Sequence, residues 1–332
     1  MSKKFIRISF PLLLLLGVYF LGPQPESPSW NDSFPVVPSS LGDLEDYVLA
    51  NESKHLIKTG NEAQIIWNDS LPIKTEYSVV YLHGFSASQM EGDPVHRNFA
   101  RAFGCNLFLA RLADHGIDTT EQLLYFTADR IWESSKEALA IGQQLGEKVI
   151  LISTSTGGTM ALALAAAFPG KVHAMINMSP NIEINNPMAY MLNNPWGLQI
   201  ARLNKGGNYQ EIPYEAERKL YWNEKYRLES LVQLQEILED KMTVATFKKV
   251  IQPTLTLYYY KNENEQDPTV KVSAMLTMHE ALGTTDDLKV AKAIPNCGAH
   301  VMGSSLVSKD LETVQLAIEE FALNQLKMKK VN

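Results

Sequence analysis

The sequence predicts an α/β protein in which a mostly parallel central sheet is covered by helices on both faces. Short apolar segments rich in β-branched residues alternate with longer helical segments along most of the chain. One of these strands runs directly into an alanine-rich helix through a few small residues. The 332 residues are 45% hydrophobic and 20% charged, which suits one large core of about 250 residues together with an insertion.

The periodicity of apolar residues defines the individual elements. Strands are expected over 64–67, 77–82, 106–111, 148–153, 174–178, 254–260 and 288–293. Helices are expected over 95–103, 131–145, 157–168 and 308–326. About seventy residues separate the strand at 174–178 from the next one, which is far more than a loop requires. Residues 180–251 are therefore predicted to form an inserted helical cap.

The segment from Val149 to Gly158 joins a strand to the alanine-rich helix through small residues around Ser155. A nucleophile on such a sharp turn needs little bulk two positions before and after it, because the backbone is strained there. Ser153 and Gly157 hold these positions, and Ser153 replaces the first glycine of the usual G-x-S-x-G pattern. A plain loop or a helix N-cap is the alternative interpretation of this Ser, Thr and Gly cluster.

A second turn follows the strand at 77–82 and contains His83, Gly84 and Phe85. The oxyanion formed in acyl transfer needs two backbone N–H donors, one after the nucleophile and one from an earlier loop. The amides of Phe85 and Thr156 are the candidates. Gly84 would let the backbone approach a substrate. His83 is interpreted as a hydrogen-bonding brace of the loop and not as a catalytic base.

Two further polar candidates lie after later strands. Asp267 lies in a charged run, and His300 lies in the loop after the last predicted strand. A serine hydroxyl needs a base to take its proton, and a carboxylate on the other side of that base fixes its tautomer. We therefore predict Ser155 as nucleophile, His300 as base and Asp267 as acid. Asp267 as a solvated turn residue and His300 as a surface histidine are the alternatives, and Glu183 is the reserve acid.

In these features the sequence resembles the α/β-hydrolase superfamily, and within it the monoacylglycerol-lipase-like and carboxylesterase-like serine hydrolases. The resemblance covers about residues 77–326 and depends on both turns and on the order serine, acid, histidine along the chain. It implies the α/β-hydrolase fold over 61–328 and a carboxylic ester hydrolase that forms an acyl-enzyme. It also implies that Asp114 and His115 are structural. A thioesterase, an acyltransferase, a peptidase and a catalytically silent binding protein remain open.

The predicted cap is rich in methionine and aromatic residues. Met188, Trp196 and Trp222 are the candidates for a substrate pocket, although such residues also form a cap's own core. An apolar cap would exclude water from the reacting groups and favour hydrophobic esters such as monoacylglycerol-like lipids. A small-molecule, lipid-like ester is thus the expected partner.

Charge and cysteine content exclude other classes of protein. The formal net charge of −7 argues against a nucleic-acid partner, which calls for a basic face. The sequence has no phosphate-binding loop and no metal-ligand spacing, so no metal or organic cofactor is expected. The two cysteines, Cys105 and Cys297, are too few for a disulfide scaffold. Cys297 is interpreted as a small buried hydrophobe and not as a nucleophile.

Residues 1–22 have the layout of a secretory signal. Lys3, Lys4 and Arg7 precede an apolar run that is shorter than the ~20 residues of a membrane-spanning helix. No small-x-small cleavage site follows, so a cleaved signal peptide and a retained membrane anchor both remain open. Either would place the catalytic domain outside the cytoplasm, in the periplasm or the extracellular space. Residues 23–60 are expected to be a linker and an N-terminal extension.

Overall fold

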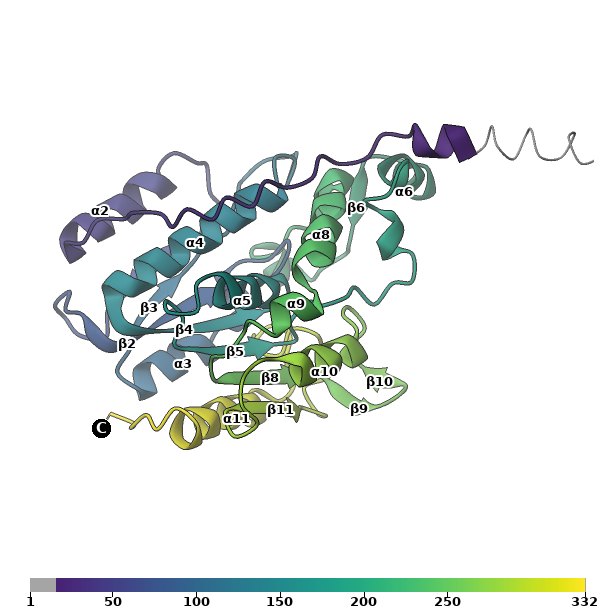
Figure 1. Ribbon diagram of the computed structural model, residues 1–332. Coiled ribbons are helices and arrows are strands. Elements are labelled where there is room, and N and C mark those ends of the chain that lie inside the picture. Colours follow the sequence, from purple (N-terminus) through teal and green to yellow (C-terminus); the bar gives the residue numbers. More distant parts are fainter. Residues whose placement is uncertain (1–15, 332) are drawn as a thin grey trace, which may run out of the picture.

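The computed structural model describes residues 16–331, and a seven-stranded sheet forms its centre (Figure 1). The strand order is β1-β3-β2-β4-β5-β8-β11, and each pair is parallel except β1 with β3. The strands are β1 (Gln64–Ile66), β2 (Thr75–Leu82), β3 (Asn106–Leu109), β4 (Gly146–Thr154), β5 (Ala174–Met178), β8 (Thr254–Tyr258) and β11 (Lys289–Ala293). The predicted mostly parallel sheet is confirmed.

Helices cover both faces of this sheet, as predicted (Figure 1). One face carries α2 (Leu41–Glu52), α4 (Ala128–Leu145), α5 (Thr156–Ala167) and α10 (Val272–Ala281). The other face carries α3 (Val95–Ala102) and α11 (Leu311–Asn324). Because side chains alternate along a strand, each face of the sheet supplies its own hydrophobic core.

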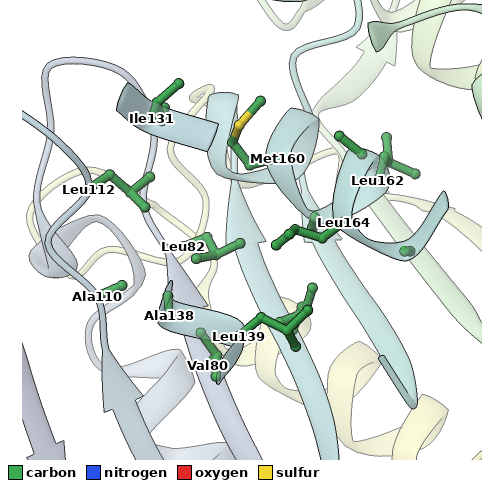
Figure 2. Packing of buried hydrophobic residues seen from close by; sticks show 14 of the residues in the cluster. Val80, Leu82, Ala110, Leu112, Ile131, Ala138, Leu139, Met160, Leu162 and Leu164 are labelled. Carbon is green, nitrogen blue, oxygen red and sulfur yellow. The ribbon is translucent and has the colours of Figure 1, made fainter. Parts of the chain in front are cut away.

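Strand β2 shows how this alternation divides the core. Val80 and Leu82 join the cluster formed with α4 and α5, where Figure 2 shows them near Leu139 and Leu164. Val79 and Tyr81 join the cluster formed with α3 and α11. Both faces of the strand are therefore buried, which explains its continuous apolar sequence.

The insertion between β5 and β8 has structure of its own. It contains η2 (Ala189–Met191), α6 (Gly197–Lys205), β6 (Tyr209–Glu211), α7 (Ala216–Lys219), β7 (Lys225–Arg227), α8 (Leu228–Lys241) and α9 (Val244–Phe247). Strands β6 and β7 form a separate antiparallel pair. Ile237 of α8 is fully buried in the same cluster as α4 and α5, so this cap packs directly on the main domain.

Several boundaries differ from the predicted ones, and three of the differences have a clear structural cause. Helix α4 begins at Ala128 because the Thr127 side chain caps it, and α11 begins at Leu311 because Asp310 accepts the Thr313 N–H. Strand β8 ends at Tyr258, and the chain continues into a short pair of strands, β9 (Tyr260–Asn262) and β10 (Glu265–Gln266). This pair turns the chain toward Asp267.

The N-terminal segment expected to be a linker packs on the domain. Lys136 of α4 is buried, and its Nζ donates to the carbonyl oxygens of Asn31 and Ser33 at 2.7 Å each. The backbone N–H groups of Ser29 and Trp30 donate to one carboxylate of α4, and Figure 1 shows the purple segment running beside this helix.

The expected signal peptide or membrane anchor, residues 1–22, lies mostly outside the described residues. Within residues 16–331, no helix has the length and apolar character needed to cross a membrane.

Candidate active site

Ser155 lies at the sharp turn between β4 and α5. Its backbone has φ 53° and ψ −120°, a strained conformation that few L-residues adopt. The Ser155 N–H donates to the Met178 carbonyl oxygen at 3.1 Å, and the Asn181 N–H donates to the Ser155 carbonyl oxygen at 2.9 Å. Backbone hydrogen bonds on both sides therefore hold the turn, and the Ser155 side chain projects at the carboxyl end of β4.

The residues around the turn explain how the chain packs so tightly. A Cβ atom on Gly157 would lie 1.9 Å from the carbonyl oxygen of Leu82, so only glycine fits there. Ser153 replaces the other usual glycine, and its buried hydroxyl donates to Asn177 Oδ1 at 2.8 Å. This hydrogen bond satisfies the extra polar atom, which makes serine acceptable at this position.

The buried Asp267 forms a hydrogen-bonded pair with the partly buried His300. His300 Nδ1 lies 2.7 Å from Asp267 Oδ2, and Asp267 Oδ1 accepts the backbone N–H groups of Thr269 (2.8 Å) and Val270 (3.1 Å). Burial alone would raise the pKa of Asp267, but the charge and hydrogen bond of His300 and both amides hold this pKa below its ordinary value. Asp267 is therefore a fixed anion that orients the imidazole ring.

The same hydrogen bond that lowers the pKa of Asp267 raises the pKa of His300. Burial alone would lower the pKa of His300, but the charge and hydrogen bond of Asp267 outweigh it, so this pKa lies above its ordinary value. With Nδ1 bound to Asp267, Nε2 is the nitrogen available for proton transfer. No hydrogen bond joins Nε2 to the Ser155 hydroxyl in this conformation, although both side chains line one cavity.

This cavity has a volume of about 430 Å³ and lies between the sheet and the cap. It brings together residues that are far apart in the sequence, including Phe85, Glu91, Ser155, Thr156, Asn181, Arg218, Trp222 and His300. A larger cavity of about 710 Å³ lies between α8, α9 and α10, and its walls hold none of the three predicted catalytic residues. The smaller cavity is therefore the candidate active site.

Both predicted oxyanion donors lie at this cavity. Phe85 and Thr156 line it, and among residues 16–331 the Phe85 N–H donates to no acceptor. Thr156 is the first residue of α5, where a backbone N–H has no acceptor within its own helix. The cavity thus has two amide donors available for an anionic oxygen.

Comparison with known proteins places this geometry in a wider context. No family model matches the chain, and no curated protein matches its sequence. Solved structures do match. A structure from the metagenome-derived lipolytic enzymes LipS and LipT is 18% identical and covers 80% of this chain and 98% of its own, with a TM-score of 0.64.

Two other matches have similar coverage. The Paleococcus ferrophilus monoacylglycerol lipase is 13% identical and covers 79% of this chain and 98% of its own, with a TM-score of 0.58. A soluble variant of the Saccharomyces cerevisiae monoglyceride lipase, solved with a substrate analog, is 11% identical, with a TM-score of 0.60. The match covers 81% of this chain and 92% of the lipase chain. The chain has the α/β-hydrolase fold.

Within the α/β-hydrolase fold, His83 braces the loop that carries Phe85. His83 Nε2 accepts the Leu112 N–H at 3.0 Å, and Nδ1 lies 2.8 Å from the Gly84 carbonyl oxygen. Burial and the nearby His115 and Arg111 hold the pKa of His83 well below its ordinary value, so the ring is neutral with its proton on Nδ1. Asp114 forms an ion pair with Arg130 at 2.7 Å.

The predicted pocket residues divide into two groups. Trp222 is buried and lines the cavity with Ser155. Met188 is 56% exposed and lies in the walls of a different hollow beside α6. Trp196 starts α6, where its Nε1 donates to the Val18 carbonyl oxygen at 3.0 Å. Neither Met188 nor Trp196 lines the cavity that contains Ser155, so a substrate contact of these two residues stays a prediction.

The reserve acid Glu183, the exposed Asp286 and the nearby cysteine lie outside the cavity. Glu183 is exposed and forms an ion pair with Lys271. Asp286 forms an ion pair with Lys289 at 3.1 Å on the surface. Cys297 is buried, and burial raises the pKa of its thiol, so it is a small core residue rather than a nucleophile.

Two charged residues of the cavity, Glu91 and Arg218, could not be predicted as site residues from the sequence. Glu91 lies in η1 (Gln89–Gly92), where its carboxylate accepts the Gly84 N–H, and burial raises its pKa to about 7. Arg218 lies in α7 of the cap. Glu91 lies in a polar stretch, and Arg218 lies in a charged run between Glu217 and Lys219, and both patterns are typical of a solvated surface. Only the fold brings both to the cavity that contains Ser155.

Proposed function

We propose that the protein is a serine ester hydrolase that forms an acyl-enzyme on Ser155. The observation that carries the proposal is the Asp267–His300 pair, with its 2.7 Å hydrogen bond, because its histidine lines the same cavity as the strained Ser155. An orienting carboxylate, a histidine and a serine at a sharp turn are the parts that acyl transfer needs. The likeness to solved lipases and esterases agrees with this reaction.

The proposed reaction has two halves. His300 Nε2 takes the proton from the Ser155 hydroxyl as its oxygen attacks the ester carbonyl, and the amides of Phe85 and Thr156 stabilise the resulting oxyanion. The imidazolium then donates the proton to the leaving alcohol. A water molecule, activated in the same way, attacks the acyl-enzyme and releases the carboxylic acid. Asp267 remains ionised throughout and stabilises the imidazolium.

The apolar part of the cavity supports esters with a hydrophobic acyl group. Ile184, Ile212, Leu231 and Leu234 line it alongside the predicted catalytic residues. Burial of each methylene of an acyl chain contributes about 0.8 kcal/mol, so an extended apolar wall would favour longer chains. The two matching lipases named for monoacylglycerol and monoglyceride agree with such a substrate class.

The first experiment is labelling of the purified protein with a fluorophosphonate probe. We expect stoichiometric labelling at Ser155, loss of labelling in Ser155→Ala, and a decrease in kcat of about 10⁶-fold for Ser155→Ala on p-nitrophenyl esters. Asp267→Asn should decrease kcat by roughly 10⁴-fold, because the imidazole then takes the wrong tautomer. A folded wild-type protein that neither labels nor hydrolyses any ester in an acetate-to-octanoate series would refute the proposal.

A further inference from the structure

Arg218 places a positive charge in the wall of the candidate active site. It belongs to α7 of the cap, and it lines the cavity together with Ser155 and His300. Its charge is close enough to lower the pKa of His300, although other contributions raise that pKa overall. The guanidinium therefore lies within electrostatic reach of the reacting groups.

This arginine has no acidic partner. Among the described residues, no carboxylate oxygen lies within 4.0 Å of its guanidinium nitrogens, and its buried Nε makes no hydrogen bond. Other arginines of the cap are paired, since Arg202 and Arg227 both bind Glu229 at 2.6 Å and 2.5 Å. Arg202 Nε is also buried without a hydrogen bond, but the Arg202 guanidinium has a carboxylate partner and that of Arg218 has none. A guanidinium without a counter-charge in the wall of a cavity is costly, so it indicates a missing anionic ligand.

Two aromatic rings hold the guanidinium in place. Its central carbon lies 4.2 Å from the centroid of the Tyr214 ring and 5.0 Å from that of Trp222. Such contacts attract the guanidinium through its charge and use none of its N–H groups, which stay available for hydrogen bonding. A fixed, planar set of donors matches the oxygens of a carboxylate or a phosphate.

The nearest acid in the cavity already has another partner. Glu91 accepts the Gly84 N–H, and a Cβ atom on Gly84 would lie 2.8 Å from Glu91 Oε2 and 2.9 Å from the Ser155 Cβ. This carboxyl group is therefore wedged against the loop before Phe85, on the Ser155 side. It interacts with Arg218 through its charge but forms no ion pair with it.

Accepting the ester hydrolysis proposed above, we propose that Arg218 binds an anionic group, a carboxylate or a phosphate, carried by the ester substrate. The substrate would then combine an apolar chain against Leu231 and Leu234 with a negative charge at Arg218. This charge belongs either to the acyl part or to the alcohol part of the ester, and the two positions require different test substrates.

The test compares matched esters that differ only in one charge. For the acyl part the pair is p-nitrophenyl hexanoate and the mono-p-nitrophenyl ester of adipic acid. For the alcohol part the pair is a 1-monoacylglycerol and the 1-acylglycerol 3-phosphate with the same acyl chain. We expect at least one pair to show about tenfold higher kcat/KM for the anionic member, the effect of one charge-assisted contact.

Variants assign this preference to one residue. Arg218→Met should abolish the preference, because kcat/KM for the anionic ester falls about tenfold further than that for its neutral partner. Arg218→Lys should keep part of it, since the charge remains without the planar donors. Lys219→Met is the matched control, because Lys219 is the next residue, pairs with Glu224 at 2.9 Å and does not line the cavity. It should keep the full preference.

Each alternative result has a distinct meaning. Hydrolysis of the neutral esters without any preference in either pair, or with a preference that persists in Arg218→Met, would overturn the anion site and leave the esterase intact. Hydrolysis of the neutral ester by Arg218→Met also shows that this variant is folded. Absence of both probe labelling and ester hydrolysis in wild-type protein would instead overturn the proposed function, and the anion site with it.

Discussion

Three charged residues surround His300 and decide at which pH it can act as a base. Burial lowers the pKa of the imidazole, Asp267 raises it through its charge and its hydrogen bond, Glu91 raises it further, and Arg218 lowers it. Only the neutral imidazole can take a proton from Ser155. Because the pKa of His300 is raised overall, kcat/KM should increase with pH through a midpoint above the ordinary histidine value of about 6.5.

Substitutions of two of these residues should move that midpoint in opposite directions. Glu91→Gln removes a negative charge but keeps an oxygen that accepts the Gly84 N–H, so the pKa of His300 should fall and the midpoint should move to lower pH. Arg218→Met removes a positive charge, so the midpoint should move to higher pH. The measurement is kcat/KM against pH on a neutral ester, with Lys219→Met as control. Equal midpoints in both variants would contradict this electrostatic arrangement.

The strand–turn–helix unit of β4 and α5 depends on contacts between backbones. Helix α5 starts so close to β2 that the Gly157 Cα lies against the Leu82 carbonyl group, while a Cβ atom on Gly170, after the same helix, would meet nothing within 4 Å. Backbone atoms cannot move aside as a flexible side chain can. The position of the proposed nucleophile therefore depends on the absence of a side chain at one residue.

Gly157→Ala should consequently destabilise the protein by about 3 kcal/mol or prevent its folding. The matched control is Gly170→Ala, which should change the free energy of unfolding by less than about 0.5 kcal/mol, as an exposed substitution without steric conflict does. Urea denaturation monitored by circular dichroism measures both. If Gly157→Ala is as stable as Gly170→Ala, the close approach of α5 to β2 described above is not required.

At the scale of the whole molecule, the N-terminal segment connects the main domain to the cap. Trp30 packs edge-on against Trp132 of α4, and its Nε1 donates to Asp240 of α8 at 2.8 Å. Lys241, also in α8, lies over the Trp30 ring at 3.9 Å. One side chain thus joins a helix of the main domain to a helix that reaches the active-site cavity through Leu231 and Leu234.

Trp30→Ala should lower the free energy of unfolding by about 2–3 kcal/mol, because it removes a partly buried ring and one hydrogen bond. Val36→Ala in the same segment is the control, since Val36 is 95% exposed and its truncation should have almost no effect. Thermal and urea denaturation report both changes. Equal stability of the two variants would show that the segment behaves as the free linker that its composition predicts.

Local sequence patterns were sufficient for the seven strands of the central sheet and for the helices α3, α4, α5 and α11, but they did not predict α2 or α10. Strand β4, the small residues around Ser155 and the alanine-rich helix are adjacent in the chain, so the strand–turn–helix unit is visible in ten residues. The prediction of a cap also needed only the length between β5 and β8. The contact of residues 29–33 with α4 could not be predicted, because Pro- and Ser-rich composition does not reveal a partner such as the buried Lys136.

The sequence by itself determined a parallel α/β sheet, an inserted cap and a serine at a sharp turn, because each follows from periodicity, spacing or side-chain size over a short stretch. Only the tertiary structure decided that Asp267 binds His300, that Met188 and Trp196 lie outside the cavity, and which charges surround it. Glu91 and Arg218 come from a loop of the main domain and a short helix of the cap. Their positions result from packing between distant elements, which no local pattern of residues encodes.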